Sequence, residues 1–370
     1  MLNMRISLYC LFMLLMAASV MGQDLNTKNI IVVTLDGYRW KELFEGPDDR
    51  IINNPDFITD RSAMAAFNGA HIYEKRSKLM PFFWNVIAQQ GQLYGNRNYK
   101  NKVNCVNHHL LSYPGYSEMF VGYAAKGVSS NKEKDNPNAT VFEFINEQHA
   151  FENKVAAFAT WDIFNYIFRE KQSSLPVIAG NDPPPSHAGA HKKDKKGRSD
   201  KETFAYAMDY LEHERPRVLF IGFDGTDFHG HGGRYDKYLE AAQQADKMIA
   251  ELWAWVQAQP DYKDQTTLFI TTDHGRGSGK KNWRNHRLLA PGSRHIWFAV
   301  MGPDTPAFGE LTFKGKYYQK QVAQTIAAFL GLQYKAAKPT GEIVQTMVAA
   351  PVMADNESRS GNALEQTSNR

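Results

Sequence analysis

The chain has 370 residues, of which 43% are hydrophobic and 12% aromatic, so it can bury a large core in one α/β domain or in two smaller ones. Its formal net charge is +4, and no helix-length segment carries a sustained basic stripe. This composition excludes a largely disordered chain. The modest charge argues against a nucleic-acid duplex as the partner.

Residues 1–22 have the composition of a secretory signal peptide. Arg5 precedes an apolar stretch of about a dozen residues, and small residues follow around Ala18 and Gly22. The stretch is too short to span a membrane, so we expect a secreted protein, most simply a periplasmic one, without a stable membrane anchor. Cleavage would remove Cys10 and leave Cys105 without a disulfide partner in the chain.

Five apolar, β-rich runs are typical of strands that are buried on both faces. They lie at residues 29–37, 154–160, 217–225, 267–275 and 295–303. The clearest helical pattern lies between the third and fourth runs. It places apolar residues at helical spacing, namely Leu239, Ala242, Ala245, Ile249, Leu252 and Val256. Strands that alternate with helices predict a doubly wound, mainly parallel sheet flanked by helices.

Two segments interrupt this alternation. Residues 181–202 are polar and basic, which predicts a solvated loop or, as the alternative, a lid that attracts an anionic substrate. Residues 354–370 lack any apolar period and are predicted to be disordered. The folded domain should therefore span residues 23–353, with a small lid or cap built from the longer insertions.

Acidic residues and histidines follow three of the predicted strands. They are Asp36 in TLDG, Asp227 and His231 in DGTDFHGH, and Asp273 and His274 in TTDHG. Open α/β sheets bind ligands at the carboxyl ends of their strands. One strand-end aspartate is usually a turn or cap residue, but three such endings with histidines favour a metal site. The donors suit zinc, with manganese possible, and exceed what one tetrahedral ion needs, so we predict two ions.

A candidate nucleophile lies in the segment SYPGYSEMFVG. Its Ser112 comes just before Pro114, where a helix is expected to begin. The hydroxyl would then lie at the positive end of a helix dipole, which favours an attacking oxygen and the phosphate that it attacks. A serine before proline is usually only a cap or turn residue, so Ser112 is a candidate because of the metal ligands.

These motifs together resemble those of the alkaline phosphatase superfamily, in particular its type I phosphodiesterase and nucleotide pyrophosphatase branch, over roughly residues 29–340. The segment from Asp227 to His231 matches the D-x-x-G-H motif of that branch, and SYPGYSEMFVG matches the spacing of its Thr-Phe-Pro-Asn segment. The resemblance implies an alkaline-phosphatase-like catalytic domain. It also implies two ligand sets, which are Asp227, His231 and a further histidine for one ion, and Asp36, Ser112, Asp273 and His274 for the other.

The resemblance also points to residues outside the motifs. It selects His286 as the third ligand of the first ion, with His295 as the runner-up, and it places Asn131 near a phosphate oxygen. Tyr113 and Tyr116 lie beside the nucleophile, where they could stack on a base or an aryl group or else pack in the core.

The implied activity is hydrolysis of a small-molecule phosphate ester or nucleotide through a phosphoserine, by a phosphodiesterase or nucleotide pyrophosphatase. Departures from the family pattern leave the substrate open: Ser112 replaces threonine, and Gly115 and Tyr116 replace asparagine and histidine. A phosphomonoesterase is the alternative. A sulfatase is disfavoured because Tyr116 stands where sulfatases need arginine. The alternative without any enzymatic activity is a periplasmic protein that binds a metal or another ligand. The oligomeric state stays open.

Overall fold

The three strands that precede the predicted metal ligands lie side by side at the centre of an eight-stranded sheet. The computed structural model describes residues 25–185 and 197–348. The predicted signal peptide, the C-terminal tail and the middle of the basic segment lie outside these residues. Among the described residues, no helix is both long and apolar enough to cross a bilayer.

The large sheet has the strand order β10-β2-β9-β7-β1-β6-β4-β5. Its strands are β1 (Asn29–Leu35), β2 (Gln92–Tyr94), β4 (Val155–Ala159), β5 (Val177–Ala179), β6 (Val218–Phe223), β7 (Thr266–Thr271), β9 (Phe298–Met301) and β10 (Gly309–Glu310). Only β9 runs antiparallel to its neighbours, β2 and β7. The prediction of a mainly parallel sheet is therefore confirmed.

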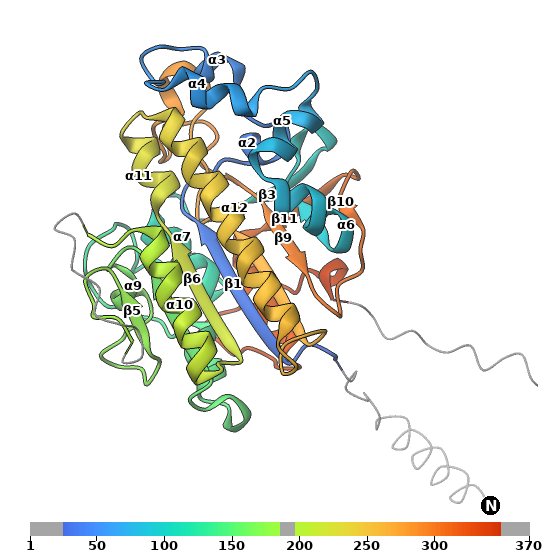
Figure 1. Cartoon of the computed structure of the whole chain (residues 1–370). Coiled ribbons are helices and arrows are strands. Elements are labelled where there is room, and N and C mark those ends of the chain that lie inside the picture. The colour runs from blue at the N-terminus through green and yellow to red at the C-terminus, as the bar shows by residue number, and fades with distance from the viewer. Residues whose placement is uncertain (1–24, 186–196, 349–370) are drawn as a thin grey trace, which may run out of the picture. The chain divides into compact units, whose positions relative to one another are not determined.

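Helices cover both faces of this sheet (Figure 1). They are α2 (Trp40–Glu45), α3 (Asp49–Ile52), α4 (Arg61–Met64), α5 (Ile72–Leu79), α6 (Ala88–Gln90), α7 (Ser112–Val121), α8 (Val141–Asn146), α9 (Phe164–Ile167), α10 (Asp200–Glu214), α11 (Gly225–His231), α12 (Tyr235–Ala258), α13 (Gly279–Asn282) and α14 (Val322–Phe329). Short 3-10 or π turns occur at Ala65–Phe67, Phe83–Ile87, Arg97–Tyr99, His149–Phe151, Gln319–Gln321 and Gln345–Met347.

Alternate residues of the central strands feed two hydrophobic cores. Ile31 and Val33 of β1 join the cluster that contains the apolar residues of α10 and α12. Ile30 and Val32 join the second cluster, with residues of α7, α8, α9 and α14. A strand presents successive side chains to opposite faces, so a run of apolar residues without alternation is what a sheet covered on both sides requires.

The run predicted as one strand at residues 295–303 is in fact two strands, so that prediction is wrong. β8 (His295–Ile296) belongs to a separate three-stranded sheet with β3 (Asn101–Asn104) and β11 (Gly315–Tyr318), whereas β9 joins the large sheet. Between them Trp297 is fully buried, and its indole N–H donates to the carbonyl of Tyr38 at 2.9 Å. The apolar pattern continues through the break because all three segments are buried.

The basic segment at residues 181–202 is also shorter than predicted. Asp200 already belongs to α10, and Ser199 caps that helix in a capping box with Glu202. Helices α2 to α5 are inserted between β1 and β2, and Figure 1 shows α3 and α4 at the same end of the molecule as α11.

Candidate active site

The carboxyl ends of β1, β6 and β7 bring the predicted strand-end residues together. Asp36 directly follows β1, and Asp273 and His274 follow β7. Asp227 and His231 lie one turn apart on α11, a short helix that begins just after β6, and His231 Nε2 is 3.1 Å from Asp227 Oδ2. The sequence predicted the place of this pair but not that a helix carries it.

The first candidate metal group consists of Asp36, Asp273 and His274, whose ligand atoms all lie within 4.8 Å of one another. His274 Nε2 is 3.6 Å from Asp36 Oδ1 and 3.4 Å from Asp273 Oδ2. Both of these carboxylate oxygens are buried, and neither has a hydrogen-bond partner. Buried polar atoms are rarely left unsatisfied, so the two oxygens are placed as ligands for a cation.

The tautomer of His274 strengthens this conclusion. Its Nδ1 lies 3.0 Å from the carbonyl oxygen of Gly275, which can only accept, so Nδ1 carries the hydrogen and Nε2 presents a lone pair to the two carboxylates. Burial lowers the pKa of His274 to about 4, which keeps the ring neutral at pH 7. A neutral nitrogen lone pair that faces two carboxylates is the donor set of a divalent transition metal.

The carboxylates repel one another in the absence of a cation. Burial, followed by the charges of Asp273 and Asp227, raises the pKa of Asp36 well above its usual value. Burial also raises the pKa of Asp273 to about 6, with the charge of Asp227 as the next cause. A bound divalent ion would remove both the desolvation cost and the repulsion.

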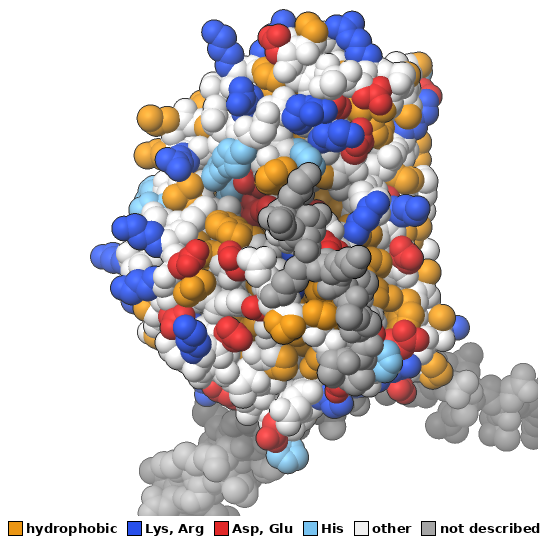
Figure 2. All heavy atoms as spheres, turned by 60° about the vertical axis from the view of Figure 1, so that its left-hand side comes forward, with side chains coloured by type: hydrophobic (Ala, Val, Ile, Leu, Met, Phe, Trp, Pro, Cys, Tyr) orange, Lys and Arg blue, Asp and Glu red, His pale blue; other side chains and the backbone are white. Residues whose placement is uncertain are grey.

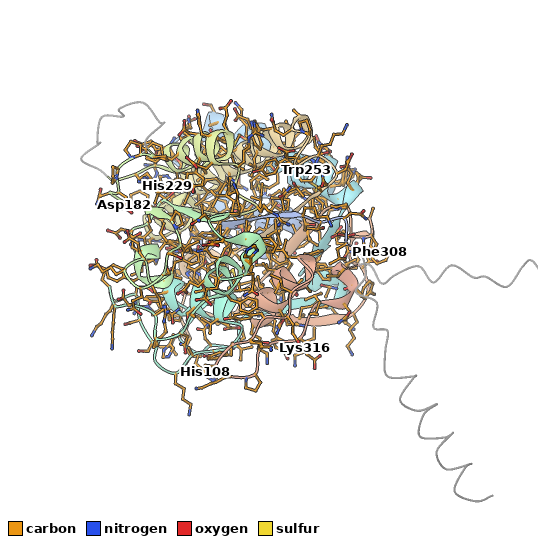
Figure 3. The ribbon with its side chains drawn as sticks, turned by 90° about the horizontal axis from the view of Figure 1, so that it is seen from below. His108, Asp182, His229, Trp253, Phe308 and Lys316 are labelled. Carbon is orange, nitrogen blue, oxygen red and sulfur yellow. The ribbon has the colours of Figure 1, made fainter. Side chains whose placement is uncertain are left out.

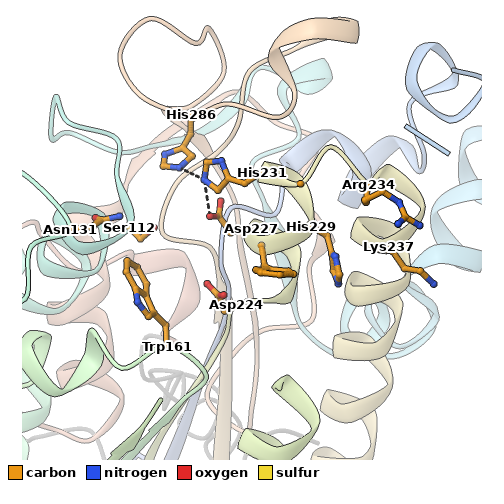
Figure 4. Close-up of a pocket in the computed structure, with 12 residues that line it drawn as sticks. Ser112, Asn131, Trp161, Asp224, Asp227, His229, His231, Arg234, Lys237 and His286 are labelled. Atoms are coloured by element: carbon orange, nitrogen blue, oxygen red, sulfur yellow. Dashed lines mark hydrogen bonds and ion pairs between the residues drawn. The ribbon is translucent and has the colours of Figure 1, made fainter. Parts of the chain in front are cut away.

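The second candidate group joins α11 to His286. The ligand atoms of Asp227, His274 and His286 lie within 4.8 Å of one another. His286 Nε2 is 2.9 Å from His231 Nε2 (Figure 4), and its Nδ1 lies 2.8 Å from the carbonyl oxygen of Leu110. As in His274, the carbonyl holds the hydrogen on Nδ1, so Nε2 of His286 is free to bind a metal.

His295, the runner-up for this position, lies elsewhere. It is paired with Asn104 in the three-stranded sheet. Burial lowers its pKa to about 4, and the neighbouring cations Arg97, Lys102 and Arg294 contribute to the shift. The structure therefore places His286, and not His295, beside His231.

Arg276 is a residue of the site that the sequence reasoning missed. Its buried guanidinium pairs with Asp227 and donates to the carbonyls of Trp283, at 2.9 Å, and Arg284. Burial alone would raise the pKa of Asp227, but the Arg276 guanidinium holds it below its usual range. Arg276 thus ties α11 to the segment that carries His286. Its only sequence signal is its place two residues after His274.

Two glycines allow the site to be this crowded. Gly37 has a φ of 60°, and a Cβ there would lie 2.5 Å from Asp227 Oδ1. Gly115 lies in α7 against the backbone of Asp273, where a Cβ would be 2.6 Å from the carbonyl oxygen. The close contact at Gly115 presses the start of α7 against the end of β7.

Ser112 is the first residue of α7 and is buried beside the first group. Its Oγ lies 3.3 Å from His274 Nε2. Asn131 lines the same pocket (Figure 4). Its Oδ1 accepts a hydrogen bond from the backbone N–H of Tyr113 at 3.0 Å. The predicted nucleophile and the predicted phosphate contact therefore lie next to each other.

Of the two roles left open for Tyr113 and Tyr116, the structure shows packing in the core. Both are buried, because α7 packs them into the second core. The Tyr116 hydroxyl donates to Asp36 Oδ2 at 3.2 Å, and the Tyr113 hydroxyl donates to the carbonyl of Lys134 at 2.7 Å. The aromatic side chains that do line the pocket are Trp161 and Phe228, and Phe228 is 68% exposed.

The pocket has a volume of about 760 Å³, and its lining includes Ser112 and the candidate ligands Asp227, His231 and His286. The two aromatic residues and two cations, Arg234 and Lys237, also line it. Both cations already have partners, since Arg234 pairs with Asp236 at 2.9 Å and Lys237 pairs with Glu240 at 2.6 Å.

A family model described as the metalloenzyme superfamily matches residues 127–333. A comparison with curated proteins finds no match. Among solved structures, the lipoteichoic acid synthase LtaP from Listeria monocytogenes is similar, with 13% identity and a TM-score of 0.56 over 84% of this chain and 74% of that one. The phosphonate monoester hydrolase of Agrobacterium radiobacter has 12% identity and a TM-score of 0.54, over 88% and 78%.

Murine ectonucleotide pyrophosphatase/phosphodiesterase 5 has 14% identity and a TM-score of 0.52, and the match covers 87% of this chain and 100% of that one. At these identities the likeness shows the fold alone. The family model, however, covers more than half of the chain. The protein therefore belongs to the metalloenzyme superfamily and has the fold of the alkaline phosphatase superfamily.

Proposed function

We propose that the protein is a two-metal hydrolase of phosphate esters that works through a phosphoserine at Ser112. The observation that supports this most is the orientation of His274, whose Nε2 lone pair faces buried, unpartnered oxygens of Asp36 and Asp273. A buried arrangement of this kind is costly for the fold unless a cation joins the three groups.

The resemblance to the phosphodiesterase and nucleotide pyrophosphatase branch implies how the ions would divide. One would be held by Asp227, His231 and His286, and the other by Asp36, Ser112, Asp273 and His274. Carboxylate and imidazole ligands without cysteine suit zinc, with manganese as the alternative. When bound, such ions act as Lewis acids that favour the serine alkoxide and neutralise charge on the phosphoryl group.

The chain's own residues would carry the covalent steps. The Ser112 hydroxyl loses its proton to solvent and Oγ attacks phosphorus, so that an Oγ–P bond forms while the bond to the leaving oxygen breaks. The N-terminus of α7 would stabilise the phosphoryl oxygens through its dipole. Asn131 holds a non-reacting oxygen. Water then cleaves the Oγ–P bond, which releases phosphate or its monoester and restores the serine.

The pocket favours a diester over a monoester. A monoester dianion gains from an unpaired cationic side chain, but Arg234 and Lys237 are both paired with carboxylates. Trp161 and Phe228 instead offer apolar surface for a second organic group. We therefore propose a small diester or nucleotide-like substrate, with a phosphomonoester as the alternative.

A matched substrate panel tests this proposal. Purified protein with zinc or manganese should show a higher kcat/KM for an aryl phosphodiester than for the corresponding monoester, and the lowest for the aryl sulfate. A monoester preference of tenfold or more, about 1.4 kcal/mol in transition-state stabilisation, would replace the diesterase by a phosphatase.

The covalent step has its own test in a pair of serines from the same helix. Ser112→Ala should remove nearly all metal-dependent turnover, whereas Ser117→Ala, which is also buried in α7, should keep it. Turnover by Ser112→Ala above a few per cent of wild type would show that no phosphoserine forms.

Export to the periplasm is a further part of the proposal, and the N-terminal sequence of the mature protein would test it.

A further inference from the structure

The segment at residues 278–291, which we call the mouth loop, carries His286 into the site and two leucines out into solvent. Leu288 is 62% exposed and Leu289 is 93% exposed. The loop is anchored by Trp283, which is fully buried against Tyr235 and Phe57. Single exposed leucines are common, but an adjacent pair beside a functional pocket indicates a surface that another partner covers.

Cations surround the two leucines. Lys280, Lys281, Arg284 and Arg287 all lie in the mouth loop and are exposed. Within the part of the chain that the structure describes, none of the four has a carboxylate ion-pair partner. Figure 2 shows one face of the molecule, with Lys and Arg side chains near histidines in its upper part and a few Asp and Glu side chains among them. The loop therefore presents unneutralised positive charge together with exposed apolar surface.

The backbone holds the leucines in this exposed position. Arg287, directly before them, has a φ of 104°, which is unusual for a residue with a side chain. On one side, His286 is tied to the carbonyl of Leu110 at 2.8 Å. On the other, the N–H of Ala290 donates to the carbonyl of Arg287 at 3.0 Å. Leu288 and Leu289 thus form the tip of a tight turn that is fixed at both ends.

We propose that the mouth loop docks the protein reversibly on an anionic lipid surface. Leu288 and Leu289 enter the boundary between headgroups and acyl chains, while the four cations lie against the lipid phosphates. A soluble polyanion would satisfy the cations but would leave the leucines in water. Because His286 belongs to the same loop, docking would bring the mouth of the pocket to the lipid surface.

Vesicle binding tests the proposal without any turnover, so its outcome is independent of the proposed hydrolase activity. Intact protein is sedimented with vesicles of phosphatidylcholine alone or of phosphatidylcholine with about one third phosphatidylglycerol, which carries the anionic charge. We expect partition onto the anionic vesicles only, and weaker partition as the salt concentration rises.

Two double variants separate the apolar from the charged contribution. Leu288→Ser with Leu289→Ser should weaken partition at least about tenfold, because both side chains lose their apolar burial. Lys280→Ser with Lys281→Ser should weaken it by up to about thirtyfold at low ionic strength. The matched controls are Phe308→Ser, at a phenylalanine that is 59% exposed, and Lys316→Ser. Figure 3 shows Phe308 and Lys316 on a different side of the molecule from His229, and both controls should bind like wild type.

Thermal unfolding followed by circular dichroism checks that the variants are folded, and neither leucine lines the pocket. Three outcomes would overturn the proposal. They are no partition onto anionic vesicles, equal partition onto phosphatidylcholine alone, and salt-sensitive partition that the leucine variant leaves unchanged. The last result would mean that the loop is a binding surface for soluble polyanions.

Discussion

Buried carboxylates occur in two settings in this molecule, and they are satisfied in different ways. Glu118, in α7, accepts hydrogen bonds from the backbone N–H groups of Val106 and Asn107 and from the side chain of Asn107, at 2.7 to 3.0 Å. Asp246, in α12, accepts from two consecutive backbone N–H groups. At the site, by contrast, Asp36 and Asp273 each keep one buried oxygen without any hydrogen-bond partner.

The difference separates carboxylates that stabilise a turn from carboxylates that are placed to bind a cation. A carboxylate that receives backbone hydrogen bonds stabilises a local turn and needs nothing from outside the chain. A carboxylate that faces another carboxylate and a histidine lone pair destabilises the fold until a cation arrives.

The largest expected effect is stabilisation by metal. Addition of zinc to chelator-treated protein should raise the free energy of unfolding by about 4 kcal/mol per site at a thousandfold excess over Kd, because the ions bind only the folded ligand sets. Thermal or denaturant unfolding with and without zinc measures the change. An unchanged unfolding curve would mean that the orphaned oxygens do not form a metal site.

His286→Ala should remove about half of that gain, since one ligand set loses its third member while Asp36, Asp273 and His274 remain. The matched control is His295→Ala, which should keep the full gain because His295 lies in the three-stranded sheet. The same unfolding assay compares the two variants. If His295→Ala loses zinc stabilisation and His286→Ala does not, the two ligands have been assigned the wrong way round.

Glu118→Gln should lower the free energy of unfolding by about 2 to 3 kcal/mol, because the amide NH₂ cannot accept the backbone N–H groups that the carboxylate accepts. The loss should be the same with and without zinc, as Glu118 holds a turn and not an ion. Denaturant titration measures it, with the exposed Glu147→Gln as control. If Glu118→Gln lowered the free energy of unfolding only in the zinc-loaded protein, Glu118 would contribute to metal binding and not to the turn.

Asp36→Asn should have the opposite sign, with a gain of about 1 to 2 kcal/mol in the metal-free protein, because a neutral amide removes repulsion at a buried site. The pKa of Asp36 is raised in the folded state above the usual aspartate value of 3.8. The free energy of unfolding of the wild type should therefore fall as the pH rises above 3.8, and the stability gain of Asp36→Asn should grow over the same pH range. Zinc should reverse the order of stability. Denaturant unfolding at several pH values measures the difference, with Asp56→Asn, at an exposed residue, as control. If Asp36→Asn is less stable than wild type at every pH, the prediction is wrong.

Local pattern and topology were sufficient to predict much of the site. Asp36, Asp227 and Asp273 follow long apolar strands, and parallel strands end at one edge, so their proximity followed from the sequence. His286 was found only through resemblance to a family. The contact of Tyr116 with Asp36 and the contact of Arg276 with Asp227 join segments far apart in the chain, and no local period marks either.

The fold shows the same division. The central strands have six or seven residues, long enough for an apolar run to be visible, whereas β2 and β5 have three residues each and carry no readable pattern. The boundary between the two sheets at Trp297 could not be predicted from the sequence. Trp297 is buried, so it extends the apolar run in the same way as a strand residue would. The sequence did not show which aromatic residues line the pocket. A residue next to Ser112 in the sequence, such as Tyr113, can still face the core.

The most direct test of the central claim is anomalous diffraction at the zinc absorption edge from crystals of the zinc-treated protein. The account predicts two peaks per chain, one among Asp36, Ser112, Asp273 and His274 and the other among Asp227, His231 and His286. A well-ordered site without a peak, or with zinc bound only at other residues, would contradict the claim that these carboxylates are buried in order to hold metal ions.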